Sequence, residues 1–313
     1  MTSPLSSWQE TQTRQAIVDY VASVVDENGS KYVPPEERIA VFDNDGTLWC
    51  EKPAQVQIGF ILQRLAEMAG KDASLRKQQP WQAAHEKDMA WFGDAITRHY
   101  HGDESKVEVL LPGILKAFGA MSVETFAKLA DDYMRQTKHP TLGVSVMELT
   151  FQPMVELLRY LEANNFTNYI VSGGGRDFMR PVTEELYNVP PERVIGSAVT
   201  LKYQADDQGV TIMREPGLNV IDDGPAKAVQ IWERVGRYPI LAAGNANGDI
   251  PMLQLAEANP HASFCMLVSH DDAGREFNYT AGAEDALKMA QDRGWVLASL
   301  NQDWRHVFAF QAK

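Results

Sequence analysis

The sequence predicts an α/β fold whose core is a doubly wound parallel sheet interrupted by a helical insertion. Two observations indicate this class: short apolar runs recur along the chain with helical segments between them, and residues 53–148 contain no convincing strand. Near-continuous apolar strands that alternate with helices are typical of a parallel sheet covered on both faces. We therefore expect a core domain formed by 1–52 and 149–313, with 53–148 inserted as a helical domain.

Each predicted core strand is a short apolar run that ends in polar residues or glycine. These runs lie at 38–43, 168–172, 239–244, 263–269 and 295–300. Two further runs, at 193–203 and 209–215, are separated by a short polar turn and predict a hairpin.

The predicted helices follow from apolar spacing and from their end residues. The segment 153–165 begins with a proline, and 226–236 ends in a glycine, which are common helix boundaries. A helix is also expected at 13–25. Within the insertion, 57–70 and 122–136 are amphipathic, and Ser122 is a suitable N-cap for the second of these.

Composition narrows the class of protein. The 313 residues carry a formal net charge of −13, and no stretch concentrates Lys and Arg, which argues against nucleic-acid binding. No apolar window is long enough for a membrane helix, so we expect no membrane partner. The N-terminus does not resemble a signal peptide, which predicts a cytoplasmic protein, or a periplasmic or secreted one if a signal peptide has been removed. Oligomeric state is not predicted.

Two carboxylates, Asp43 and Asp45, stand one residue apart directly after the first apolar strand. The carboxyl ends of parallel strands meet at one edge of the sheet, so these acids should lie near Ser172, Asn245 and Asp249. Like charges this close repel unless a cation joins them. Carboxylate, amide and carbonyl oxygens are hard ligands that suit Mg²⁺. The sequence therefore predicts a Mg²⁺ site at this edge.

The remaining groups at this edge indicate an anion site. Ser172 supplies a hydroxyl, and Gly173 and Gly174 permit close approach of backbone N–H groups ahead of a helix. Lys227 lies at the start of the 226–236 helix and supplies a compact positive charge. A cation, a hydroxyl, amides and a lysine together suit a phosphoryl group.

At this point the sequence resembles the haloacid dehalogenase-like hydrolases. The family's four motifs occur in order: D-N-D-G-T at 43–47, I-V-S-G-G at 170–174, G-P-A-K at 224–227 and G-N-A-N-G-D at 244–249. Each motif alone is commonplace and would suit a turn, a solvated lysine or a helix cap. The ordered set is not commonplace. The resemblance covers 38–255, is closest to the phosphoserine phosphatase-like branch, and implies a Rossmann-like core with 53–148 as the helical cap.

The resemblance implies a role for each motif residue. Asp43 would be the nucleophile, and Asp45 would be the acid and base that serves the leaving group and then water. Thr47 would support the loop and the phosphate site. Asp43 and the carbonyl of Asp45 would bind Mg²⁺. Asn245 stands where the family commonly has Asp, so its amide oxygen would replace a carboxylate and Asp249 would carry more of the metal site.

The implied function is a Mg²⁺-dependent phosphatase that hydrolyses a small-molecule phosphate monoester. Alternatives are a phosphomutase or a dehalogenase on the same fold, or a non-catalytic binder of a phosphorylated ligand. Dehalogenases of this family lack the second aspartate, so Asp45 argues against that alternative. A mutase would retain the phosphoryl group.

The residues that select the substrate are less clear from the sequence. Glu51 lies near the family's cap-entry glutamate, and Arg64 and Arg98 are candidates by residue type. The segment 270–272, His-Asp-Asp, either lines the entrance to the substrate site or is an exposed acidic loop. We expect His85, His99 and His101 on helix surfaces rather than at a metal.

Overall fold

The computed structural model describes residues 5–100, 103, 105–207 and 209–312. The chain forms two compact units, which we describe separately. The first comprises 1–53, 134–197 and 221–313, and the second comprises 54–133 and 198–220.

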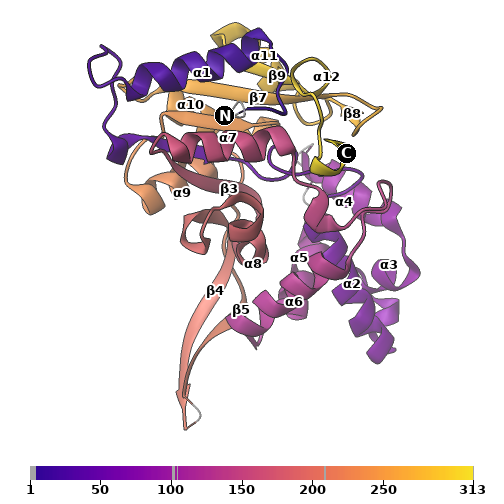
Figure 1. The fold of residues 1–313 in the computed structure, drawn as a ribbon. Helices are drawn as coiled ribbons and strands as arrows, with labels where there is room; N and C mark the ends of the chain where they lie inside the picture. Colours follow the sequence, from indigo (N-terminus) through magenta and orange to yellow (C-terminus); the bar gives the residue numbers. More distant parts are fainter. Residues whose placement is uncertain (1–4, 101–102, 104, 208, 313) are drawn as a thin grey trace. The chain divides into compact units, whose positions relative to one another are not determined.

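The first unit is built on a mainly parallel sheet (Figure 1). Neighbouring strands follow the order β4, β3, β1, β6, β7, and β7 also pairs with β9 in parallel and with the short β8 in antiparallel. The strands are β1 (Ile39–Phe42), β3 (Thr167–Gly175), β4 (Val194–Asp206), β6 (Leu241–Gly244), β7 (Phe264–Asp271), β8 (Asn278–Tyr279) and β9 (Val296–Ser299).

Helices connect and cover these strands. In the first unit they are α1 (Gln12–Val25), α7 (Gln152–Ala163), α8 (Arg176–Tyr187), α9 (Pro225–Val235), α10 (Ile250–Glu257), α11 (Glu284–Arg293) and α12 (Leu300–Asp303). Single turns of 3₁₀ helix lie at Pro35–Glu37, Val146–Glu148, Pro191–Arg193, Asn247–Asp249 and Ala309–Ala312.

The sheet is buried on both faces, as expected for a doubly wound fold. Every residue of β1 and of β6 is buried. One continuous apolar cluster joins alternate residues of β1 and β7 to α9, α10 and α11 through Ile231, Met252 and Ala286. Helices α7 and α1 also contact the sheet, at β3 and β9 respectively. This packing holds the carboxyl ends of β1, β3 and β6 in fixed positions.

The second unit is mainly helical, with one hairpin. Its helices are α2 (Val56–Lys71), α3 (Trp81–Glu86), α4 (Met89–Tyr100), α5 (Val107–Phe118) and α6 (Val123–Gln136), with a 3₁₀ turn at Leu75–Lys77. The strands are β2 (Met121–Ser122) and β5 (Gly209–Val220), and β5 pairs with β2 and with the outer part of β4. Aromatic rings of Phe60, Phe118 and Phe126 pack together in its interior.

The predicted fold class and all five predicted core strands are confirmed. The predicted helices and the hairpin are also present, although β4 and β5 are longer than expected. The compact units divide between 53 and 54, one residue from the predicted start of the insertion, but the second boundary differs from the predicted one: the hairpin residues 198–220 join the second unit, and 134–148 join the first. The reason is contact: β5 pairs with β2 and packs on α5, while His139 in the 134–148 segment binds the Lys52 carbonyl.

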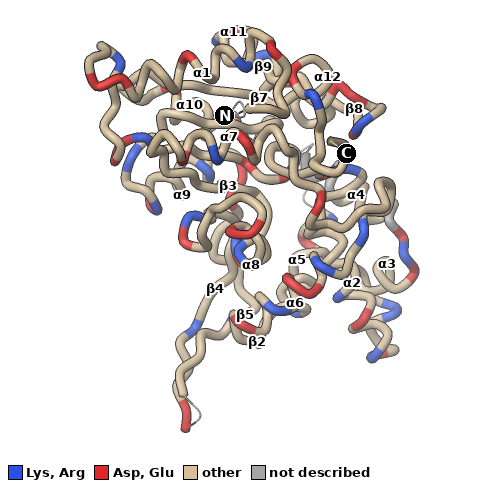
Figure 2. Tube along the Cα trace, in the orientation of Figure 1, with Lys and Arg blue, Asp and Glu red and all other residues tan. Residues whose placement is uncertain are grey.

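The structure also answers three expectations on membrane helices, charge and histidines. None of the helices in the described ranges has the length and apolar character required to span a bilayer. Lys and Arg are interspersed with Asp and Glu along the described chain (Figure 2). His85 is exposed, whereas His101 and the side chain of His99 lie outside the described residues.

Helix α9 offers a matched test of the core. Ile231 is fully buried in the apolar cluster, whereas Val229, two residues earlier, is 54% exposed. We expect Ile231→Ala to lower the free energy of unfolding by about 2–5 kcal/mol, because it removes buried methyl groups and leaves a cavity. Val229→Ala should change it by less than about 0.5 kcal/mol. Urea denaturation measures both, and equal losses would contradict the packing of α9.

Candidate active site

The loop that follows β1, residues 43–47, is held by backbone hydrogen bonds at both ends. The Asp43 amide donates to the Ala243 carbonyl at 2.9 Å, which ties the loop to β6. The Asn44 carbonyl accepts from the amides of Leu48 and Trp49 at 2.8 and 3.1 Å, which closes the turn. We call residues 43–47 the Asp43 loop. Its position follows from the pairing of β1 between β3 and β6.

A buried lysine joins two of the predicted acids. Lys227 Nζ lies 2.7 Å from Asp43 Oδ1 and 2.6 Å from Asp249 Oδ1, and it donates to the Val171 carbonyl at 3.1 Å. All three side chains are at least nine-tenths buried. Lys227 comes from the first turn of α9, Asp43 follows β1 and Asp249 follows β6. The three predicted residues therefore converge at one edge of the sheet.

The electrostatics of this group follow from burial and charge. Burial raises the pKa of Asp43 well above its usual value, and the Asp249 charge adds to this, while Lys227 opposes both. Burial disfavours a charged Lys227, but Asp249 and Asp43 outweigh it and raise the lysine pKa. Lys227 is therefore a permanent cation in this site.

Asp249 uses both carboxylate oxygens to hold the protein. Oδ1 accepts from Lys227, and Oδ2 accepts from the backbone amides of Asn245 and Ala246 at 2.9 and 3.0 Å. Gly244 makes room for this arrangement, because a Cβ there would lie 2.5 Å from the Asp249 side chain. Asp249 thus shapes the loop after β6, and its Oδ1, which accepts a single hydrogen bond, keeps a lone pair that could bind a metal directly or through water.

Oxygen atoms suitable for a metal lie on the other side of Asp43. Thr47 Oγ1 is within 3.4 Å of Asp43 Oδ2 and 3.2 Å of Asn245 Oδ1, so the three side chains are neighbours. No cluster of three His, Cys, Asp or Glu suitable for a metal occurs among the described residues. The available set is one carboxylate, one amide oxygen and backbone carbonyls. These hard donors fit Mg²⁺, which completes its shell with water or phosphate oxygens.

The carboxyl end of β3, residues 172–175, has the features of an anion site, and we call it the Ser172 glycine segment. Ser172 is buried, and its hydroxyl accepts from the Gly174 amide at 3.0 Å. The strand is irregular between Ser172 and Gly175, and α8 begins immediately afterwards without a side-chain cap. The amino end of an uncapped helix favours negative charge. Ser197 supports the segment by donating to the Gly173 carbonyl at 2.8 Å.

Asp45, the second acid of the Asp43 loop, is held by a hydrogen bond from a tryptophan. Its Oδ1 accepts from the Trp49 indole at 2.8 Å. Burial raises the pKa of Asp45 to about 6, the Glu51 charge adds to this, and the Trp49 and Ser172 hydrogen bonds lower it. A carboxyl with a pKa near neutrality can both give and take a proton.

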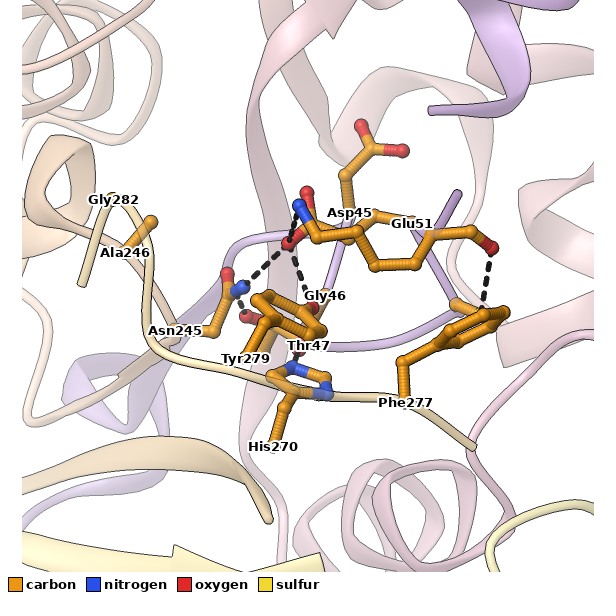
Figure 3. Close-up of polar contacts among 12 residues, drawn as sticks. Asp45, Gly46, Thr47, Glu51, Asn245, Ala246, His270, Phe277, Tyr279 and Gly282 are labelled. Carbon is orange, nitrogen blue, oxygen red and sulfur yellow. Dashed lines mark hydrogen bonds and ion pairs between the residues drawn. The ribbon is translucent and has the colours of Figure 1, made fainter. Parts of the chain in front are cut away.

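Glu51 lies beside this acid and is fixed by three neighbours (Figure 3). Its Oε1 accepts from the Tyr279 hydroxyl at 2.7 Å and from Asn245 Nδ2 at 3.3 Å, and Lys52 Nζ is 3.7 Å away. The Asn245 side chain therefore faces Thr47 through its oxygen and Glu51 through its nitrogen. Glu51 therefore contacts Asn245, a residue of the fourth motif, and its part in substrate selection stays a prediction.

Other residues singled out in the sequence serve structural contacts. Arg64 donates to the Ala117 carbonyl, and Arg98 forms exposed ion pairs with Asp94 and Asp103. Of the 270–272 segment, Asp271 accepts from Ser299 and Asn301, and Asp272 accepts from the amides of Gly274 and Arg275. His270 is buried and contacts the Asp43 loop.

Sequence reasoning missed an acid close to Lys227. Asp222 is fully buried, and neither carboxylate oxygen has a hydrogen-bond partner among the described residues. Burial raises the pKa of Asp222 to about 7, although the Lys227 charge lowers it. The only available signal was its place five residues before the motif lysine, in I-D-D-G-P-A-K.

Comparison with known proteins now identifies the family. The model of the haloacid dehalogenase-like hydrolase family matches residues 40–254, which is more than half of the chain. The chain therefore belongs to the haloacid dehalogenase-like hydrolases, as the four motifs predicted. No match was found among curated proteins.

Solved structures show the same fold. A conserved protein of unknown function from Anaerococcus prevotii DSM 20548 is 15% identical with a TM-score of 0.58, covering 97% of this chain and 98% of the other. A protein of unknown function from Bordetella pertussis Tohama I is 16% identical with a TM-score of 0.51, covering 84% and 99%. Cytosolic 5′-nucleotidase IIIB, bound to cytidine, is 13% identical with a TM-score of 0.50, covering 92% and 85%.

The glycine of the Asp43 loop can be tested against a matched glycine. Gly46 and Gly143 both have positive φ, +80° and +71°, so alanine costs about 1–2 kcal/mol at either position. A Cβ at Gly46 would also lie 2.1 Å from Asn245 Nδ2, whereas Gly143 has open space. We expect Gly46→Ala to destabilise the protein more than Gly143→Ala, by at least about 1 kcal/mol in urea denaturation. Equal losses would contradict the close approach of Asn245.

The buried acid Asp222 predicts a stability that depends on pH. Its folded-state pKa, about 7, lies above the unfolded value near 3.8, so it lowers stability as pH rises from about 4 through 7. We expect Asp222→Asn to raise the free energy of unfolding at pH 8, by up to about 4 kcal/mol. The gain should shrink toward pH 4. Urea denaturation at both pH values measures this, with the exposed Asp292→Asn as control. A gain that is the same at both pH values would contradict the assignment.

Proposed function

We propose that this hydrolase is a Mg²⁺-dependent phosphatase that cleaves phosphate monoesters of small molecules through an aspartyl-phosphate on Asp43. The observation that carries the proposal is the convergence of Lys227 with Asp43 and Asp249, next to the Ser172 glycine segment. A carboxylate nucleophile beside a permanent cation and an anion-binding helix end suits attack on an electron-rich phosphorus.

In the first step an Asp43 carboxylate oxygen forms a bond to phosphorus while the bond from phosphorus to the ester oxygen breaks. Asp45 gives its proton to the leaving oxygen, for which a pKa of about 6 is suitable. Lys227 and the amides around Gly173 and Gly174 hold the phosphoryl oxygens, and Ser172 contributes its hydroxyl. Lys227 and the Gly174 amide already donate within the protein, so in the proposed complex they would redirect or share these hydrogen bonds with the phosphoryl oxygens.

In the second step water attacks the phosphorus of the aspartyl-phosphate. Asp45, now ionised, accepts a proton from that water, and the bond between Asp43 and phosphorus breaks. Inorganic phosphate leaves and Asp43 returns as a carboxylate. The Trp49 indole holds Asp45 in one orientation for both proton transfers.

The metal would be held by Asp43, the Asp45 carbonyl, Asn245 and Asp249, with Asp249 acting directly or through water and also ordering the loop backbone after β6. When bound, Mg²⁺ would neutralise charge on the phosphoryl oxygens. Because Asn245 is neutral, the site has one negative charge fewer than a two-acid motif, and we expect weaker metal affinity for that reason.

A small phosphate ester is the proposed substrate class. Family membership and the proposed phosphoryl site around Lys227 and Ser172 support it. One solved protein of similar fold is a 5′-nucleotidase bound to cytidine, which supports a phosphate ester of nucleoside size as one member of the assay panel.

Substitution of Asp43, the proposed nucleophile, tests the proposed phosphatase activity most directly. We expect the protein to release inorganic phosphate from members of a panel of small phosphate monoesters in Mg²⁺ and to lose this activity in EDTA. Asp43→Asn should lower kcat by at least about 1,000-fold, because an amide cannot form the acyl phosphate. Asp292→Asn makes the same chemical change at an exposed position of α11 and should leave kcat unchanged.

Two results would contradict the proposal. One is hydrolysis by Asp43→Asn at near the rate of the unsubstituted protein. The other is absence of phosphate release from every ester, in Mg²⁺, by protein whose circular dichroism shows it folded. Transfer of the phosphoryl group to a second hydroxyl of the product, without release, would instead identify a mutase.

A further inference from the structure

A buried histidine contacts the Asp43 loop from β7. His270 is 4% exposed, and its Nε2 lies 2.8 Å from the Gly46 carbonyl oxygen. Its Nδ1 lies 3.1 Å from Glu276 Oε2, and Glu276 is also buried. Both ring nitrogens therefore face oxygen atoms. Neither residue belongs to the four family motifs.

The hydrogen-bond partners determine which nitrogen carries a proton. A backbone carbonyl can only accept, so His270 Nε2 must donate to Gly46. Glu276 Oε2 also accepts from the Phe277 amide at 2.7 Å, and Oε1 accepts from the Cys50 thiol at 3.2 Å. One further proton lies between Nδ1 and Oε2, on either atom. In both arrangements the Nε2–H···O=C bond is present.

Gly46 is where the Asp43 loop most needs this restraint. Its φ of +80° is open to glycine, which has more backbone freedom than any other residue. The Gly46 amide donates to the Trp49 carbonyl at 2.8 Å, which orients the peptide that contains the Asp45 carbonyl. The His270 bond orients the next peptide, between Gly46 and Thr47. Both peptide planes beside the flexible residue are thus held.

The same histidine supports the residue that binds Glu51. The Tyr279 ring stacks on His270, with 4.4 Å between ring centroids and 18° between planes. Tyr279 in turn donates to Glu51, which contacts Asn245. Figure 3 shows His270 below Gly46 with Tyr279 beside it. A single buried side chain therefore contacts both the Asp43 loop and the support of Glu51.

We propose that His270, oriented by Glu276, is a positioning residue that holds the Asp43 loop in its reactive conformation through the Gly46 carbonyl. It touches no reacting atom and acts through the backbone between Asp43 and Thr47. The kinetic part of this inference rests on the proposed phosphatase function, whereas the structural part does not.

Two amide substitutions at His270 distinguish loss of the hydrogen bond to the Gly46 carbonyl from loss of the imidazole ring. The amide nitrogen of glutamine can take the place of His270 Nε2, whereas that of asparagine is too short and takes the place of Nδ1. Both variants lose the ring and its stacking on Tyr279. We expect His270→Asn to lower kcat by about 100-fold, since displacement of reacting groups by about 1 Å has that effect. His270→Gln should recover most of it, and KM should change less than kcat in both.

A second readout needs no activity. The amides of Gly46, Thr47, Leu48 and Trp49 donate within the loop, so hydrogen exchange of a peptide spanning 44–50 reports its opening. Exchange should be fastest in His270→Asn, and His270→Gln should approach the unsubstituted protein. Equal exchange in all three proteins would overturn the loop restraint. A difference in exchange with equal kcat would overturn the positioning role. If no protein hydrolyses any ester, the proposed function fails, and the exchange result alone decides the restraint.

Discussion

The buried contact of Lys227 with two carboxylates is the interaction on which this site depends. A buried lysine is costly unless its charge is met by acids, and a buried acid is costly unless its charge is met by a cation. Lys227 meets its part of this condition by contacting Asp43 and Asp249 at 2.6 to 2.7 Å, but one cation balances only one of the two carboxylates, and the pKa of Asp43 stays raised. Because the three residues come from the ends of β1 and β6 and from the start of α9, the sheet and its covering helices must be in place before the site exists.

The contacts around this group hold Asp43 from two directions. Lys227 holds the side chain, and His270 holds the backbone of the same loop three residues later. Asp249 also holds backbone, by accepting from the amides of Asn245 and Ala246. The charged groups at this site thus have two effects. They set the protonation of the acids for which chemistry is proposed, and they order the loops after β1 and β6.

Much of the core and of the motif set could be predicted, because their signals are local. A run such as 38–43 is apolar over its length and ends in acid, and parallel strands bring such ends to one edge. The relative roles of Asn245 and Asp249 could not be weighed in this way, since the hydrogen bonds of Asp249 to backbone amides have no sequence pattern. The assignment of the β4–β5 hairpin to the helical unit depends on the pairing of β5 with β2, which spans about ninety residues of chain.

By itself the sequence determined the class of the fold, the sheet edge at which the motif residues meet and the identity of the four motifs, because strand ends and glycine turns are encoded by neighbouring residues. Only the tertiary structure decided which polar groups are paired. It left Asp222 without a hydrogen-bond partner in the described chain, and it placed His270 against Gly46 although 224 positions separate them. Burial and pairing set the free energy of a charge, and both arise from contacts between distant segments.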